Sequence, residues 1–262
     1  MSVQLQELIA SLIQSAPSPE LANVSHNLKT ISGASSSTVE DSLTRYIHSQ
    51  PIAVSGYIVS QHNKDPKSSK YVDYVRGQRF NFDLRRDQVI DVETVGDLAR
   101  VDAKLVSSLE QYGKDYFYDF SFTVIPSDDV GVFRVVIVGQ RRNMENFYTG
   151  VWRSEYEIKD GRIEGDVSID IHYFEDGNVR LKYSDVVNGE LSNGGGGGAN
   201  AVVNFINKTE NQIEKKIIAE FQVLNQQSFK NLRRLLPVTR SKINWGNAIG
   251  NYRLGSDVVN RK

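Results

Sequence analysis

The chain has 262 residues, of which 39% are hydrophobic and 24% charged, and it contains no cysteine. This composition is typical of a folded globular protein and argues against a disordered chain. The lack of cysteine excludes disulfides, thiol catalysis and thiolate metal sites, and it fits a reducing, intracellular setting. No apolar run approaches the roughly 20 residues that cross a bilayer. The first residues carry Glu7 and lack a basic start, so we expect no signal peptide.

Charge is distributed unevenly along the chain. Of its 31 basic and 32 acidic residues, residues 221–262 hold eight basic and one acidic, which gives +7. Residues 1–220 therefore hold 23 basic and 31 acidic residues, which gives -8. We expect the basic segment to meet an anionic surface. Nucleic acid, anionic lipid, an acidic protein and the chain's own acidic body all satisfy this, and charge alone does not separate them.

The first 50 residues have the pattern of three short helices. Apolar residues recur at helical spacing within 5–13, 21–31 and 39–47. Ser18 and Pro19 predict a helix start, with Ser18 as N-cap and Pro19 at the first helical position. Serines at 35–37 break the pattern, and Pro51 ends it. Each stripe covers one helix face, so the helices must pack on each other or on a partner.

Two strands and a helix are predicted in residues 51–115. The strands cover 52–59 and 78–84, with a polar loop at 63–69 between them, and the helix covers 97–112.

Residues 116–183 have the clearest pattern, five consecutive strand-like runs. They are 118–124, 132–138, 152–158, 167–173 and 179–183. In the third run, apolar positions alternate with Arg153, Glu155 and Glu157. Asp160-Gly161 and the 176–178 segment supply hairpin turns, and the connections are too short for parallel crossovers. We therefore predict a five-stranded antiparallel meander with one face to cover, and an α+β fold.

A run of five glycines at 194–198 precedes a long helical pattern. A phosphate-binding loop would continue with Lys-Ser/Thr, but Ala199-Asn200 follow, so we interpret the run as a flexible surface loop. The helix predicted over 200–235 would be about 50 Å long. That length exceeds the width of five strands spaced about 4.8 Å apart. Pro237 ends the helix.

The final segment is amphipathic but a weak helix former. Four residues recur there at helical spacing: Trp245, Ala248, Ile249 and Tyr252. Gly246 and Gly250 interrupt them, which lowers the helix propensity. Such a segment is a candidate for ordering on a partner.

The residues carry no recognisable catalytic or metal site. The four histidines, at 26, 48, 62 and 172, lack metal-ligand spacing, and no nucleophile-elbow or dinucleotide-binding motif occurs. His172 falls on a strand face with Ser168 and Asp170, which favours a hydrogen-bonded sheet histidine. We therefore expect no enzyme activity, cofactor or metal.

Three sequence strings point to one protein family more specifically than the patterns above. They are NFYTGVWRSEY at 146–156, IHYFEDGNV at 171–179 and FKNLRRLLPVTR at 229–240. In this order, and before Trp245, they closely resemble the alpha subunit family of F-actin-capping protein. The resemblance is strong from about residue 146 to residue 245 and collinear upstream. The three helices, the meander and the long helix also match the family's architecture.

The resemblance implies half of an obligate alpha/beta heterodimer. Each subunit would give five strands to a ten-stranded sheet, crossed by two long helices, so the capping protein beta subunit would complete this sheet. The dimer would bind the barbed end of F-actin and block subunit addition and loss, in the cytoplasm at the cortical actin cytoskeleton. No bond would be made or broken.

The resemblance also divides the chain into parts of one intertwined unit. These are a helical stalk at 1–50, a small mixed globule at 51–115, the sheet at 116–190, the long helix at 199–236 and an actin-binding tail at 237–262.

The actin-binding residues implied are Lys230, Arg233, Arg234, Arg240, Lys242, Trp245 and Ile249. The basic ones would face acidic actin surface, where attraction speeds encounter and paired arginines slow release. For Lys230 a solvated helix position is the alternative, and for Trp245 and Ile249 docking onto the chain's own sheet.

Arg233, Arg234 and Arg240 would also bind phosphoinositide head groups, in competition with actin. A peripheral membrane protein and a nucleic-acid-binding protein remain rival interpretations. The acidic body argues against nucleic acid.

Overall fold

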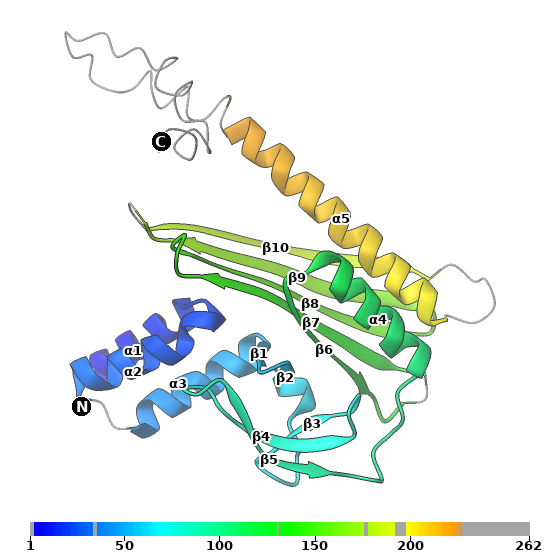
Figure 1. Ribbon diagram of the computed structural model, residues 1–262, viewed down its shortest axis with the longest axis horizontal. Helices are drawn as coiled ribbons and strands as arrows, with labels where there is room; N and C mark the ends of the chain where they lie inside the picture. Colours follow the sequence, from blue (N-terminus) through cyan, green and yellow to red (C-terminus); the bar gives the residue numbers. More distant parts are fainter. Residues whose placement is uncertain are drawn as a thin grey trace, which may run out of the picture. The chain divides into compact units, whose positions relative to one another are not determined.

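The computed structural model describes residues 3–33, 36–129, 131–175, 178–191, 198–224 and 226. The chain divides into two compact units, Met1–Asn211 and Gln212–Lys262. The first unit holds three N-terminal helices, three antiparallel sheets, helix α4 and the start of helix α5 (Figure 1).

The three predicted N-terminal helices are present. They are α1 (Val3–Ser15), α2 (Leu21–Ser32) and α3 (Ser36–Ser49), with the short 3-10 helix η1 (Ser18–Glu20) before α2. The prediction of Ser18 as an N-cap is wrong, because Pro17 holds that position and makes no side-chain cap. Ser18 is buried and accepts a hydrogen bond from Arg153 instead. Gly33 ends α2 in the left-handed conformation, with φ of 59°.

Residues 52–94 form two small sheets. Their elements are β1 (Ile52–Val54), β2 (Tyr57–Val59), the 3-10 helix η2 (Gln61–Asn63), β3 (Tyr71–Asp73), β4 (Gln78–Asp83) and β5 (Gln88–Thr94). The strand predicted over 52–59 is a hairpin, because Ser55 and Gly56 both adopt positive φ, 49° and 80°, and reverse the chain. The strand predicted over 78–84 is confirmed as β4, and β3 and β5 flank it in the order β3-β4-β5.

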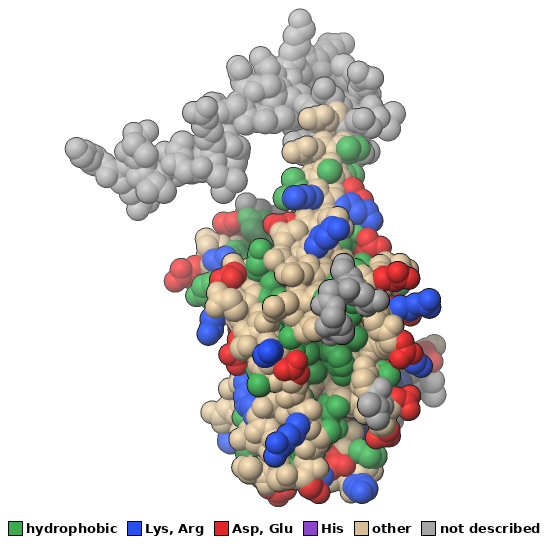
Figure 2. Space-filling view, turned by 90° about the vertical axis from the view of Figure 1, so that its right-hand side faces the viewer, with side chains coloured by type: hydrophobic (Ala, Val, Ile, Leu, Met, Phe, Trp, Pro, Cys, Tyr) green, Lys and Arg blue, Asp and Glu red, His purple; other side chains and the backbone are tan. Residues whose placement is uncertain are grey.

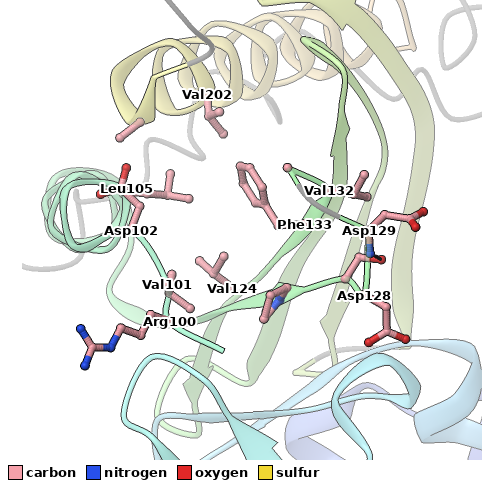
Figure 3. Close-up of a pocket in the computed structure, with 14 residues that line it drawn as sticks. Arg100, Val101, Asp102, Leu105, Val124, Asp128, Asp129, Val132, Phe133 and Val202 are labelled. Atoms are coloured by element: carbon pink, nitrogen blue, oxygen red, sulfur yellow. Dashed lines mark hydrogen bonds between the residues drawn. The ribbon is translucent and has the colours of Figure 1, made fainter. Parts of the chain in front are cut away.

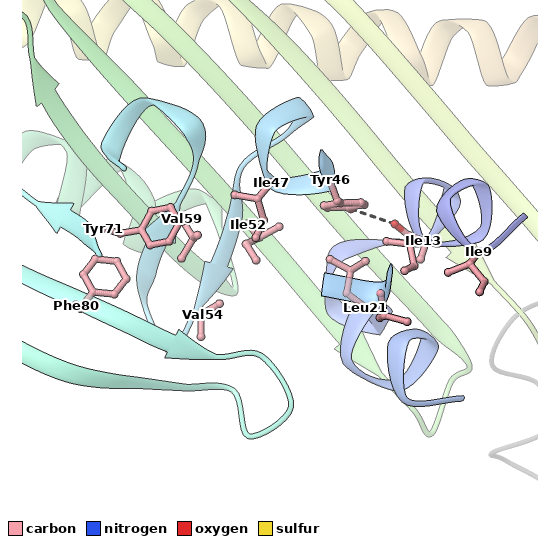
Figure 4. Packing of buried hydrophobic residues seen from close by; sticks show 12 residues of the cluster. Ile9, Ile13, Leu21, Tyr46, Ile47, Ile52, Val54, Val59, Tyr71 and Phe80 are labelled. Carbon is pink, nitrogen blue, oxygen red and sulfur yellow. Dashed lines mark hydrogen bonds between the residues drawn. The ribbon is translucent and has the colours of Figure 1, made fainter. Parts of the chain in front are cut away.

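One continuous core joins the N-terminal helices to these strands. Ile13 of α1 and Tyr46 of α3 belong to the same buried cluster as Val59 and Phe80 (Figure 4). The Tyr46 hydroxyl donates a hydrogen bond of 3.0 Å to the Ala16 carbonyl. Much of the apolar surface of the three helices is therefore covered within this chain.

The predicted meander is confirmed, and its strands are longer than expected. They are β6 (Asp119–Pro126), β7 (Phe133–Asn143), β8 (Tyr148–Lys159), β9 (Arg162–Tyr173) and β10 (Val179–Glu190), in the order β10-β9-β8-β7-β6 and antiparallel throughout. Asp160 and Gly161 make the β8–β9 turn with φ of 50° and 75°. Asp176 and Gly177 of the other predicted turn lie outside the described residues.

Both faces of the sheet are covered, so the prediction of a single covered face is wrong. Arg153 is only 3% exposed, and it lies with Val151 on the face toward η1, α3 and β1. Ser154 and Tyr156 lie on the opposite face, toward α4 and α5. Polar residues of β8 thus meet partners in the N-terminal layer where alternation predicted solvent.

Helices α4 (Ala103–Tyr116) and α5 (Ala199–Val223) complete the described fold. The helix predicted over 97–112 begins later, because the Asp102 carboxylate caps α4 by accepting a hydrogen bond of 2.8 Å from the Lys104 amide. The long helix is confirmed over Ala199–Val223, and its predicted continuation to residue 235 extends outside the described residues.

Candidate functional site

The residues predicted to bind actin and phosphoinositides all lie outside the described residues. They are Lys230, Arg233, Arg234, Arg240, Lys242, Trp245 and Ile249. The structure describes the helix that precedes them and the sheet edge predicted to meet a partner.

A buried carboxylate attaches the first half of α5 to the sheet. Glu210 is 4% exposed and accepts three hydroxyl hydrogen bonds. Oε1 receives Ser154 at 2.6 Å and Tyr156 at 2.9 Å, and Oε2 receives Tyr112 at 2.6 Å. Trp152 Nε1 donates to the Ser154 hydroxyl at 2.9 Å. These directional contacts fix α5 along its axis and in rotation about it.

Among the described residues, the hydrogen-bond donors to the Glu210 carboxyl are neutral hydroxyl groups. Burial raises the pKa of its carboxyl above the usual value, while the bonds from Ser154, Tyr112 and Tyr156 oppose that rise. Burial, and then the neighbouring carboxylate, raise the pKa values of Tyr112 and Tyr156. Both tyrosines therefore remain protonated donors.

Sequence reasoning missed Glu210, although a signal is present. Glu210 lies four residues after Ile206 and three before Ile213, inside the apolar stripe of the helix. A charged residue in such a stripe predicts a buried polar partner set.

The second unit begins within α5 and is apolar on much of its described surface. Four large side chains between residues 218 and 224 are each about half exposed: Ile218, Phe221, Val223 and Leu224. Exposed apolar residues in such number indicate a surface for association.

Strand β10 is an open edge of the main sheet. It pairs with β9 on one side, and no other described strand pairs with its outer side. Val179 and Val186 are 64% and 73% exposed. An edge strand with exposed valines and no further described strand beside it is a template for a further strand.

Arg153 joins the N-terminal helices to the sheet. Its Nε donates to the Pro51 carbonyl at 3.0 Å, and its Nη2 donates to Ser18 and to the Tyr46 hydroxyl, both at 3.1 Å. Burial lowers the pKa of Arg153, and burial raises the pKa of Tyr46 to about 12. The guanidinium fork thus connects α3, η1 and β8.

A second set of polar contacts involves Glu20, the last residue of η1. Glu20 accepts a hydrogen bond from Thr149, and His172 Nδ1 lies 2.9 Å from Glu20 Oε1. His172 Nε2 lies 2.7 Å from Asn178 Oδ1. The prediction of a hydrogen-bonded sheet histidine is confirmed, and these contacts give His172 a structural role.

A pocket of about 300 Å³ opens between the starts of α4 and α5 (Figure 3). Leu105, Val124 and Val202 line its interior, while Asp128 and Asp129 lie at the β6–β7 connection. Its lining holds no histidine or paired base and nucleophile. We assign it no chemistry.

No group of three or more potential metal ligands occurs in the part of the chain that the structure describes. Among the described helices, none is both long and apolar enough to cross a membrane. Acidic and basic side chains of the described residues are interspersed on the face shown in Figure 2.

These features define an α+β protein whose described surfaces suit assembly with other chains. The family model of the F-actin capping protein alpha subunit matches residues 9–257. The chain belongs to this family, as its sequence strings predicted.

Proteins similar to this chain are capping protein alpha subunits. The F-actin-capping protein subunit alpha of Candida albicans is 48% identical over 285 residues, covering both chains completely. That of Debaryomyces hansenii is 47% identical over 268 residues, covering all of this chain and 99% of the relative. The homodimeric actin capping protein alpha subunit from Plasmodium berghei has the same fold, with a TM-score of 0.68 at 21% identity, covering 91% of this chain and 99% of that one.

Proposed function

We propose that this chain is the alpha subunit of a heterodimer that binds the barbed end of actin filaments and blocks subunit addition and loss. The observation that carries the proposal is the family match over residues 9–257, which includes the sheet, α5 and most of the basic C-terminal segment. The proposed location is the cytoplasm, at the cortical actin cytoskeleton. Binding, without catalysis, is the whole of the proposed activity.

In this proposal β10 is the edge at which the capping protein beta subunit continues the sheet to ten strands. The position of β10 at the edge of the sheet among the described strands, and the exposed Val179 and Val186, support that role. A second copy of this chain is the competing occupant, because the Plasmodium relative is homodimeric. The native mass of the assembly, measured with and without the beta subunit, distinguishes a heterodimer from a homodimer.

The C-terminal segment would make the contact with actin. Residues 221–262 carry eight basic residues and one acidic residue. Arg233, Arg234, Arg240 and Lys242, with Lys230 nearby, would pair with carboxylates at the filament end. Trp245 and Ile249 would supply apolar contact. Attraction over a distance raises the association rate, and desolvated arginine pairs lower the dissociation rate.

The test replaces Arg233, Arg234 and Arg240 with Glu in the co-expressed heterodimer. Inhibition of pyrene-actin elongation from barbed-end seeds is measured as a function of dimer concentration. We expect at least tenfold weaker inhibition, about 1.4 kcal/mol. The matched control replaces Lys67, Arg85 and Arg86 with Glu. These are three exposed cations of the first unit, and the control changes the net charge by the same amount. Equal capping by the triple variant and the parent would remove the role assigned to Arg233, Arg234 and Arg240.

The same three arginines are proposed to bind phosphoinositide head groups. Each charge near an anionic surface contributes about 1 kcal/mol. Vesicles containing phosphatidylinositol bisphosphate should reduce capping by the parent dimer, whereas phosphatidylcholine vesicles should not. Vesicle binding by a dimer without effect on actin growth would instead favour the peripheral membrane interpretation. Salt-sensitive retention of DNA or RNA on filters would favour the nucleic-acid interpretation.

A further inference from the structure

A groove of about 690 Å³ runs beside β6, at the edge of the sheet opposite β10. α4 forms one wall, and the turns around Gly56 and Arg76 form the other. Within the described chain, β6 pairs with β7 only, so the outward backbone groups of β6 have no strand partner. Figure 1 shows β6 as the strand of the large sheet nearest to β1–β5.

A row of three phenylalanines faces this groove. Ring centroids of Phe117 and Phe120 are 5.3 Å apart, and those of Phe120 and Phe122 are 5.6 Å apart. All three rings are partly exposed and line the groove. Gly113 fixes the row against α4, since a Cβ there would lie 2.0 Å from the Phe120 ring. The row is thus a rigid apolar surface at a strand edge.

A buried hydroxyl of β6 beside the groove has no hydrogen-bond partner among the described residues. Ser121 lines the groove and is 3% exposed, and its Oγ makes no hydrogen bond to any described residue. Buried hydroxyls in folded proteins are almost always hydrogen-bonded.

Charge at one end of the groove favours an acidic occupant. Lys114 lies on the α4 wall, and no ion pair to it forms among the described side chains. The Arg141 guanidinium lies 4.9 Å from the centroid of Tyr118, which also lines the groove. Arg76 is already paired with Asp73. Lys114 is therefore the unpaired cation in the lining, beside Glu110 as its one carboxylate, among the residues that the structure describes.

We propose that this groove binds an extended peptide segment of another protein, which adds to β6 as a sixth strand. Its backbone pairs with β6, its alternate apolar side chains contact the phenylalanine row, and an acidic residue lies beside Lys114. Strand addition draws affinity from main-chain bonds and specificity from alternate side chains. The site lies at the edge opposite β10, so it remains available when β10 is occupied.

The experiment uses the co-expressed heterodimer and a fluorescein-labelled, end-capped peptide of alternating Thr and Val with one Asp. Fluorescence anisotropy gives its Kd. Two further peptides carry N-methyl groups on the odd or on the even residues. Because alternate amides of an added strand point toward β6, one methylated peptide should bind at least tenfold more weakly and the other within about twofold of the parent. Equal effects of the two patterns, or no binding up to about 1 mM, would overturn the proposal.

Position is tested with Lys114→Glu, which should weaken binding of the Asp peptide at least threefold. The control is Lys104→Glu, an exposed lysine of the same helix outside the groove lining, which should leave Kd unchanged. If Lys114→Glu also leaves Kd unchanged, the peptide binds elsewhere and the assignment is wrong. Neither measurement involves actin, so a failure of filament capping would not alter the outcome.

Discussion

The Tyr112 hydroxyl donates a hydrogen bond of 2.6 Å to Glu210 Oε2, joining residues 98 positions apart. Tyr112 lies on α4 and Glu210 on α5, and Ser154 and Tyr156 of β8 bond the other carboxylate oxygen. One side chain therefore fixes two helices and the central strand.

Glu210→Gln tests this junction through pH. Burial raises the folded-state pKa of Glu210 above its ordinary 4.5, so its favourable contribution to stability is complete below that ordinary value and is lost as pH rises through the folded-state pKa. The glutamine variant cannot ionise. The melting temperature of the parent dimer minus that of the variant should fall as pH rises from about 4.5 toward 7. The control is Glu214→Gln, an exposed residue of the same helix, which should give no such trend. A difference independent of pH would contradict the buried-carboxylate account.

Gly189→Ala tests the contact of α5 with β10. An added Cβ would lie 2.4 Å from the Phe205 ring, so the helix or the ring must move. We expect a loss of about 1–3 kcal/mol, the usual cost of overpacking, measured by urea unfolding of the heterodimer. Gly150→Ala is the matched control, because its Cβ would meet Ile171 at an ordinary 4.0 Å. Equal losses in both variants would show that the Phe205 contact is not responsible.

Arg153→Lys tests the junction between the N-terminal helices and the sheet. A lysine cannot reach the Pro51 carbonyl, Ser18 and the Tyr46 hydroxyl together, because it lacks the planar fork of the guanidinium. Two or more buried polar groups would lose a partner, and we expect about 2 kcal/mol lower stability in urea unfolding. The exposed Arg162→Lys should be neutral. A neutral Arg153→Lys would show that the charge suffices without the fork.

Local patterns predicted most of the elements but few of their partners. Alternation located all five strands of the main sheet: β6 to β9 each contain buried positions, and in β10 partly buried positions alternate with exposed ones over most of its length. The same alternation placed Arg153 in solvent, since a strand pattern does not reveal which other segment covers its polar face. The helix prediction over 97–112 missed that Asp102 is the N-cap of α4. The prediction of one strand over 52–59 missed the turn at Ser55-Gly56, where two consecutive positive φ angles reverse the chain. The buried partners of Glu210 come from segments more than 50 residues away, a separation that no local spacing encodes.

Val186→Lys tests β10 as the partner edge. Val186 is 73% exposed, and a lysine there would be buried against the added strand at the cost of desolvating its charge. We expect at least tenfold weaker assembly with the beta subunit, measured by native mass and by co-purification. Val92→Lys is the control, at an exposed valine of β5, the edge strand of the small sheet. Normal assembly of the Val186 variant would exclude β10 as the pairing edge.

The most direct test follows single filaments by fluorescence microscopy, with the two ends distinguished by their growth rates. The co-expressed heterodimer, at saturating concentration, should stop both growth and shortening at barbed ends and leave pointed ends unaffected. This chain alone should not remain a soluble capping species. Barbed ends that continue to exchange subunits at saturating heterodimer would contradict the proposed function.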